Sequence, residues 1–131
     1  MKKIIAILTT ATLLSAGVAH AVDLTSDARI TGDLTAAAVA DKIRNECSSI
    51  SANMFSALSK ANALKKYAKS KGATDKDIKA FLNSKTEKSR INRLRNSYLA
   101  TNGAVAGNEE SYCKIGRDEI AKKSLIGSIL K

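Results

Sequence analysis

The two cysteines of this chain, Cys47 and Cys113, constrain its fold more than any other feature. They lie 66 positions apart (113 minus 47), so a bond between them would join the first half of the chain to its end. In the chain-entropy account, a closed loop of that length stabilises a fold by roughly 4 kcal/mol, a large share of a small domain's stability. Whether the bond forms depends on the compartment, because disulfides persist in oxidising compartments and are rare in the cytosol.

The first 21 residues predict the compartment. Lys2 and Lys3 precede an apolar run from Ile4 to Leu14, and the tripeptide AHA follows at 19–21. This is the layout of a secretory signal peptide, which we expect to be cleaved after Ala21. The run is too short for a membrane anchor, since about 20 apolar residues are needed to span a bilayer. We therefore expect a periplasmic or secreted protein whose mature chain is 22–131.

In an exported chain, the simplest prediction for two cysteines is one intramolecular disulfide between Cys47 and Cys113. Two alternatives remain open from the sequence. The first is a reactive Cys113 thiolate favoured by the nearby charges of Lys114 and Arg117. The second is an intermolecular bridge. Neither cysteine has the C-x-x-C spacing of a redox motif, which favours the structural reading.

Catalysis is not expected from the residue types available. The only histidine, His20, lies in the predicted signal peptide, so the mature chain has no imidazole for nucleophile pairs, zinc ligation or acid/base chemistry. The adjacent Asp118 and Glu119 are no converging pair, because neighbouring helix positions point about 100° apart. We expect no enzyme activity, no cofactor, no metal site and no small-molecule substrate.

Hydrophobic periodicity predicts an all-α fold, a small bundle of about five helices with one disulfide staple. Residues 22–33 are polar and aperiodic, which predicts a flexible N-terminal arm ahead of a single helical domain at 34–131. The helices are expected at 34–47, about 51–70, from a cap at Thr74 to a break near Ser84, from there to about Thr101, and from a cap at Asn108, with a last short turn from Ser124.

Two helical stripes carry specific expectations. In the second helix the expected inner face is Met54, Ala57, Leu58, Ala61, Leu64 and Ala68. After Asn83 the stripe changes phase, because Leu82 and Ile91 are nine residues and therefore about 180° apart on a helix. One straight helix would bury opposite faces in its two halves, so we expect the break at Ser84. Gly116 and Gly127 within helical text favour close helix packing.

Charge is concentrated in the middle of the chain. Residues 60–96 contain twelve basic and three acidic residues, a net charge of +9, whereas the mature chain as a whole has 20 Lys/Arg against 12 Asp/Glu. This predicts contact with an acidic protein or an anionic membrane surface, weakened by salt. Nucleic acid is not expected, since few aromatic residues are interleaved. The alternative is a solvated face that serves solubility. The candidate basic contact face is Lys60, Lys65, Lys66, Lys69, Lys88, Arg90, Arg93 and Arg95.

The text "EC" before Ser48, the pair Glu87-Lys88 and the closing "YCKIGRDEIAKKSLIGSIL" resemble the domain of unknown function 5333 family of small exported alphaproteobacterial proteins. The resemblance covers 34–131. It supports the disulfide and the helical fold and implies no catalytic residues.

The prediction for function is a non-enzymatic binding or accessory module, monomeric or weakly oligomeric. The alternative is a periplasmic stress chaperone of the small disulfide-bonded helical type.

Overall fold

The computed structural model describes residues 22–131, and the predicted signal peptide at 1–21 lies outside the described residues. Within 22–131 the chain forms six helices and no strand: α1 (Ala28–Glu46), α2 (Met54–Ser70), α3 (Asp75–Asn83), α4 (Lys85–Thr101), α5 (Glu109–Ala121) and α6 (Leu125–Ser128). The expected all-α bundle with one disulfide is confirmed. None of these six helices is long and apolar enough to cross a bilayer.

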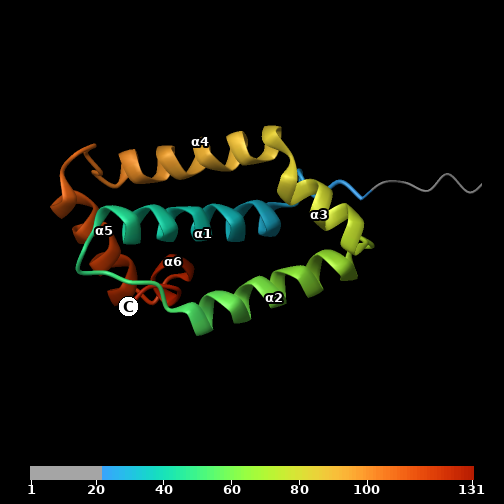
Figure 1. Ribbon diagram of the computed structural model, residues 1–131, viewed down its shortest axis with the longest axis horizontal. Helices are drawn as coiled ribbons and strands as arrows, with labels where there is room; N and C mark the ends of the chain where they lie inside the picture. The colour runs from blue at the N-terminus through green and yellow to red at the C-terminus, as the bar shows by residue number, and fades with distance from the viewer. Residues whose placement is uncertain (1–21) are drawn as a thin grey trace, which may run out of the picture.

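Helix α1 runs through the middle of the molecule, with α4 along one side of it and α2 along the other (Figure 1). Helices α5 and α6 cover the end of α1 that carries Cys47. Val39 and Ile43 are completely buried at this centre. The main core therefore lies where α1, α4, α5 and α6 meet.

The predicted start of the first helix is wrong by six residues. Helix α1 begins at Ala28 because the Asp27 side chain caps it, accepting from the backbone N–H groups of Arg29 and Ile30 at 3.0 Å each. Residues 22–33 therefore do not form the predicted arm, since Leu24 and Ile30 are buried in a second, smaller cluster with Ala68 and Ala73. That cluster joins the start of α1 to the end of α2 and to α3.

The predicted break between the third and fourth helices is confirmed at Ser84. This residue ends α3 and also caps α4, its hydroxyl accepting from the backbone N–H of Glu87. At the start of α3, Thr74 and Asp77 form the reciprocal capping box that the sequence indicates. The caps at Asn108 and Ser124 are likewise found at the starts of α5 and α6.

Two glycines allow close packing: Gly116 brings α5 against α1, and Gly127 brings α6 against the end of α5. A Cβ atom at Gly116 would lie 2.8 Å from the Ile43 side chain and would also collide with Ile50. A Cβ atom at Gly127 would collide with the backbone carbonyl of Glu119. Both contacts are tighter than side chains permit, so these positions serve packing, as predicted.

Candidate functional site

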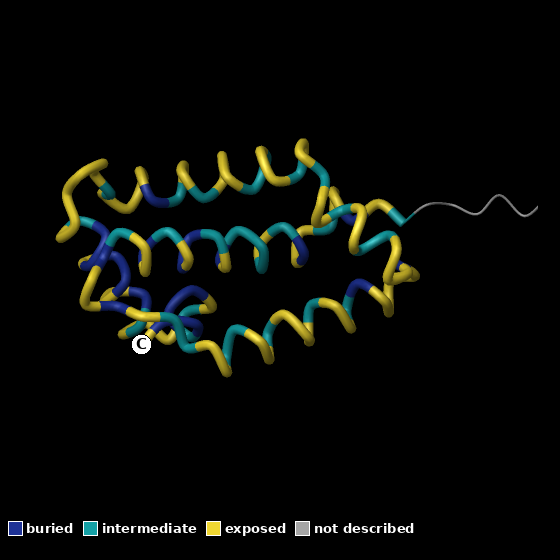
Figure 2. The backbone as a smooth tube through the Cα atoms, in the orientation of Figure 1, coloured by how far each residue is buried: buried dark blue, intermediate teal, exposed yellow. Residues whose placement is uncertain are grey.

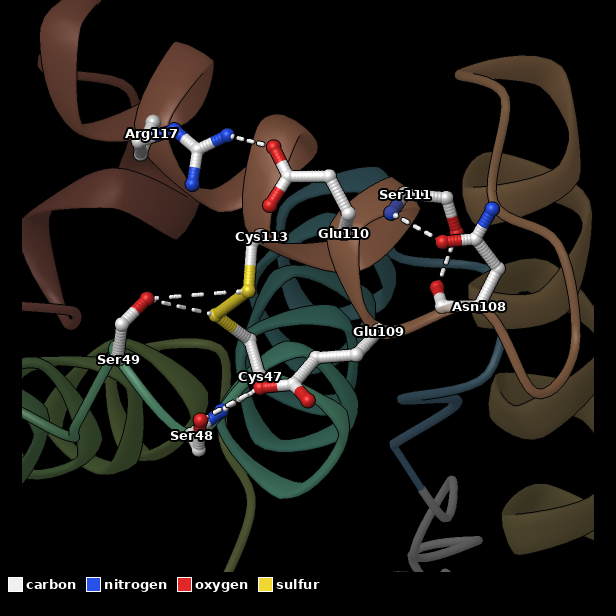
Figure 3. The surroundings of a disulfide bond; sticks show 9 residues. All are labelled: Cys47, Ser48, Ser49, Asn108, Glu109, Glu110, Ser111, Cys113 and Arg117. Carbon is white, nitrogen blue, oxygen red and sulfur yellow. Dashed lines mark hydrogen bonds and ion pairs between the residues drawn. A yellow bond between two sulfur atoms is a disulfide. The ribbon is translucent and has the colours of Figure 1, made fainter.

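The disulfide joins Cys47, at the end of α1, to Cys113 in α5, with the two Cα atoms 5.1 Å apart (Figure 3). Both cysteines are buried. The hydroxyl of Ser49 lies 3.2 Å from the Cys47 sulfur and 3.8 Å from that of Cys113. The Glu109 carboxylate, at the start of α5, accepts hydrogen bonds from the backbone N–H and the hydroxyl of Ser48 at 2.8 and 2.5 Å, and so links the same two segments beside the disulfide. The predicted intramolecular bond is confirmed.

The charges around Cys113 do not serve a thiolate. Lys114 pairs with Asp118 at 2.8 Å, and Arg117 pairs with Glu110. Glu109 places a carboxylate oxygen within 4.8 Å of both sulfurs, which is metal-ligand spacing. Sulfurs bonded to each other are not thiolate ligands, however, so this cluster is a structural junction.

A buried hydrogen-bond network holds α4, α5 and α6 together. The Tyr98 hydroxyl donates to Glu119 at 2.7 Å, and the Ser124 hydroxyl donates to the other carboxylate oxygen. Burial, followed by the hydrogen bond to Glu119, raises the pKa of Tyr98 to about 12. Burial also raises the pKa of Glu119, but the hydrogen bonds from Ser124 and Tyr98, together with the Lys122 ammonium 3.6 Å away, outweigh it and leave that pKa below its usual value. The ionised Glu119 is thus satisfied by its neighbours and acts as a structural anchor.

The eight predicted basic contact residues do not share one face. Lys60, Lys65, Lys66 and Lys69 belong to α2, whereas the other four belong to α4, and these helices lie on opposite sides of α1 (Figure 1). The α4 residues are Lys88, Arg90, Arg93 and Arg95. The structure therefore separates them into two basic surfaces.

On α4, three of the four side chains are already engaged. Arg90 pairs with Glu87 at 2.8 Å and donates to the Thr31 hydroxyl at 3.3 Å, linking α4 to α1. Arg93 donates to Ser89, and Arg95 to Asn96, both at 3.0 Å. Arg90 in particular is a structural residue, because it and Glu87 are both largely covered.

On α2, positive charge exceeds negative charge. The helix has four lysines and no acidic residue. Lys65 and Lys69 share one carboxylate, that of Asp75, at 2.9 and 2.8 Å. Their hydrogen bonds lower the pKa of Asp75 to about 2. Within residues 22–131, neither Lys60 nor Lys66 has an ion-pair partner, so most of the positive charge of α2 is not compensated by neighbouring carboxylates.

The outer side of α2 also carries apolar side chains. Met54, Phe55 and Leu58 are 70%, 90% and 63% exposed, and we name these three residues the α2 apolar patch. The expected inner positions of Met54 and Leu58 are therefore wrong. In Figure 2, α2 is mostly exposed, and Ala68 is its single buried residue. Lys65 and Lys69 follow Leu58 at helical spacing, which places patch and lysines on one outer face.

The inner side of α2 faces a groove. It has a volume of about 330 Å³ and lies between α1, α2 and α3, with α6 at one end. Its walls include Leu34, Ala37, Ala57, Ala61, Leu64 and Phe81, and Lys60 and Lys65 also line it. We name this cavity the α1–α2 groove. Sequence periodicity assigned the alanines and leucines of α2 to its inner face, but it does not report how closely another helix packs there, so the groove was missed.

Comparison with known proteins identifies a family and nothing closer. The model of a family of unknown function, DUF5333, matches residues 22–131. No curated protein and no solved structure matches the chain.

Proposed function

The chain belongs to the DUF5333 family, and we propose that it is a non-enzymatic, exported accessory protein that contacts an anionic membrane surface through the outer face of α2. The observation that carries this proposal is the placement of the α2 apolar patch beside Lys65, Lys66 and Lys69. A helix that combines exposed Phe, Met and Leu with lysines is suited to the boundary between lipid headgroups and acyl chains.

The expected binding is reversible and salt-dependent. Each lysine near an anionic surface contributes about 1 kcal/mol, and Phe55 would contribute about 1.5–3 kcal/mol if it were fully buried. Screening by salt removes the first contribution and leaves the second. The protein should therefore bind anionic vesicles at low ionic strength and leave them as salt rises.

An acidic protein would also satisfy the lysines, but the shape of the surface favours a membrane. The anchors of protein interfaces occupy well-packed pockets of the partner, and a rim excludes water around them. The α2 apolar patch lies on a helix at the outer edge of the molecule (Figure 1), with lysines further along the same helix. A lipid surface deforms around such a projection without a matching pocket.

Vesicle co-sedimentation of the mature chain tests the proposal. We expect binding to phosphatidylglycerol vesicles, little binding to phosphatidylcholine vesicles, and loss of binding in Phe55→Ser and in the triple variant Lys65→Glu, Lys66→Glu, Lys69→Glu. The triple variant Lys88→Glu, Arg93→Glu, Arg95→Glu, on the opposite basic surface, changes the net charge by the same amount and is the matched control, which should bind as the native chain does. Vesicle binding that survives the α2 variants, or capture of an acidic protein without vesicle binding, would overturn the proposal.

A stress chaperone is the second candidate, favoured by the way α2 is held to the start of α1. The Tyr67 hydroxyl donates to Asp27 at 3.1 Å, and Lys71 lies 3.8 Å from the same carboxylate. Protonation of Asp27 in acid would weaken both contacts and release apolar surface. The test is suppression of client aggregation at acid pH, together with increased binding of an apolar dye. If binding of the apolar dye does not increase as the pH is lowered, this candidate is removed.

A further inference from the structure

We propose that the α1–α2 groove binds the acyl chain of a single-chain anionic amphiphile, such as a fatty acid or a lysophospholipid, with Lys60 at the headgroup. This site lies on the inner side of α2 and shares only Lys65, at its rim, with the outer face proposed for membrane contact. It does not depend on that contact, because a monomeric amphiphile can be offered in solution without vesicles.

The groove exists because α2 is anchored at its two ends. At the first end, the Ser51 N–H donates to the Lys131 carbonyl at 2.8 Å, and the Asn53 N–H to the Ile129 carbonyl at 2.9 Å. At the second end, Tyr67 bonds to Asp27, and Ala68 is buried against the start of α1. These anchors fix the distance between the two helices.

Between the anchors, the facing side chains are too small to fill that distance. Helix α2 presents Ala57 and Ala61, and α1 presents Ala37. Ala37 and Ala61 line the cavity and are still exposed, so the groove is open to solvent rather than sealed. A ligand can therefore enter from solvent, and the groove meets the disulfide-linked core only at its α6 end, where Ile129 belongs to both.

The size of the groove suits a flexible chain better than a folded segment. An apolar cavity of about 150 Å³ is large enough to hold benzene, so 330 Å³ leaves room for a much longer hydrocarbon. A helix is about 10 Å across, so one lying between α1 and α2 would have to push these two anchored helices apart. An acyl chain is thin enough to lie between the two anchors.

The walls favour an apolar ligand over a polar one. Leu34, Leu64 and Phe81 form apolar surfaces, with Ile78 and Leu82 beside them. An extended peptide or a sugar would lose its hydrogen bonds to water here without finding replacements, which costs several kcal/mol for each unsatisfied group. Methylene groups have no such requirement and are stabilised by about 0.8 kcal/mol for each one buried.

The charges at the rim indicate the sign of the headgroup. Lys60 and Lys65 are five residues apart, so they lie about 140° apart on α2 and flank its inner stripe. Lys65 is paired with Asp75, whereas Lys60 has no ion-pair partner among residues 22–131. The lining includes one carboxylate, Asp33, and Arg29 lies 3.9 Å from it. The unmatched charge is thus the ammonium of Lys60, which fits a carboxylate or phosphate.

Titration with parinaric acid, a fluorescent fatty acid, tests the proposal on the mature, disulfide-bonded chain below the micellar concentration. We expect saturable binding with one ligand for each protein molecule. Competition separates the sources of the headgroup: palmitate reports a free carboxylate, lysophosphatidylglycerol an anionic phospholipid, and lysophosphatidylcholine a zwitterionic one. We expect at least one of the two anionic competitors to displace the probe, and the zwitterionic one to be weaker by about tenfold.

Matched variants locate the site. Ala37→Leu and Ala61→Leu keep a good helix former and should weaken binding at least tenfold by filling the groove. Ala63→Leu is the control, because Ala63 is exposed on α2 and does not line the groove. Lys60→Glu should weaken binding of the acid about tenfold and leave its methyl ester unaffected, whereas Lys79→Glu on α3 should leave both unchanged. Circular dichroism verifies that each variant is folded.

Absence of saturable binding, or equal affinity in native protein and in the folded double variant Ala37→Leu, Ala61→Leu, would overturn the acyl-chain proposal. Equal affinities for parinaric acid and its methyl ester would overturn the role of Lys60. These results are independent of membrane contact, since Phe55→Ser should lose vesicle binding while retaining the probe.

Discussion

The Tyr98 hydroxyl in α4 donates a hydrogen bond to the buried carboxylate of Glu119 in α5, at an O–O distance of 2.7 Å. The same carboxylate accepts a hydrogen bond from the hydroxyl of Ser124, which caps α6. The backbone carbonyl of Glu119 lies directly against Gly127. One acidic residue therefore positions three helices. In this part of the chain, Glu119, Ser124 and Gly127 therefore form a packing motif that joins α4, α5 and α6.

Stability should fall at alkaline pH because of Tyr98. Its pKa is raised to about 12 in the folded chain, against 10.0 ordinarily, so the folded state holds the proton more tightly than the unfolded state. The stabilisation is complete below pH 10 and is lost as the pH approaches 12. Melting temperature measured across this range should decline, and Tyr98→Phe should flatten that part of the curve. An identical decline in Tyr98→Phe would contradict the assignment.

Removing the Glu119 charge should destabilise the fold by about 1–3 kcal/mol, since Tyr98 and Ser124 would lose their charged acceptor in a buried site. Urea unfolding of Glu119→Gln measures this loss. Because the pKa of Glu119 is lowered in the folded chain, its contribution is present at neutral pH and is lost as the pH falls through that pKa. Glu110→Gln, an exposed position on the same helix, is the control and should change stability little.

Loss of the disulfide should cost about 2–5 kcal/mol. The bond spans 66 residues and joins α1 to α5 within the main core. We expect Cys47→Ser combined with Cys113→Ser, or reduction of the native chain, to lower the melting temperature markedly. Thermal unfolding with and without reductant checks this, and the double variant should show no further response to reductant.

Two glycines should respond to alanine in opposite directions. Gly127→Ala forces a Cβ atom into the backbone of Glu119, and backbone atoms cannot move aside cheaply. We expect a loss of about 2 kcal/mol or more, in the range of overpacked cores. Gly32 lies inside α1 with no atom near its Cβ position, so Gly32→Ala should stabilise by about 0.5–1 kcal/mol. Denaturant unfolding of the two variants compares them directly.

The end of α2 should open before the core does. Tyr67→Phe removes the hydrogen bond to Asp27 and should raise hydrogen exchange of the α2 amides, with a cost of about 1 kcal/mol. The amides of α4 serve as the internal reference, because α4 packs on the other side of α1. Exchange that rises equally in both helices would indicate global rather than local destabilisation.

Local signals in the sequence predicted the local structure well. The caps at Thr74, Ser84, Asn108 and Ser124 all begin helices, because a capping hydrogen bond involves residues within one turn. The start of α1 was placed too late although Asp27 is a good cap residue. Residues 22–33 have no apolar period, and the burial of Leu24 comes from contacts with distant segments.

The sequence by itself determined the helical class, the helix ends set by caps, and the two cysteines available to pair, since each follows from composition or from neighbours along the chain. Only the tertiary structure decided that the basic residues of α2 and α4 lie on opposite sides of α1 and that Met54 and Leu58 face outward. It also decided that a groove separates α1 from α2. The reason is that periodicity reports which residues share a helix face, whereas the distance between two helices is set by remote anchors such as Asn53 on Ile129 and Tyr67 on Asp27.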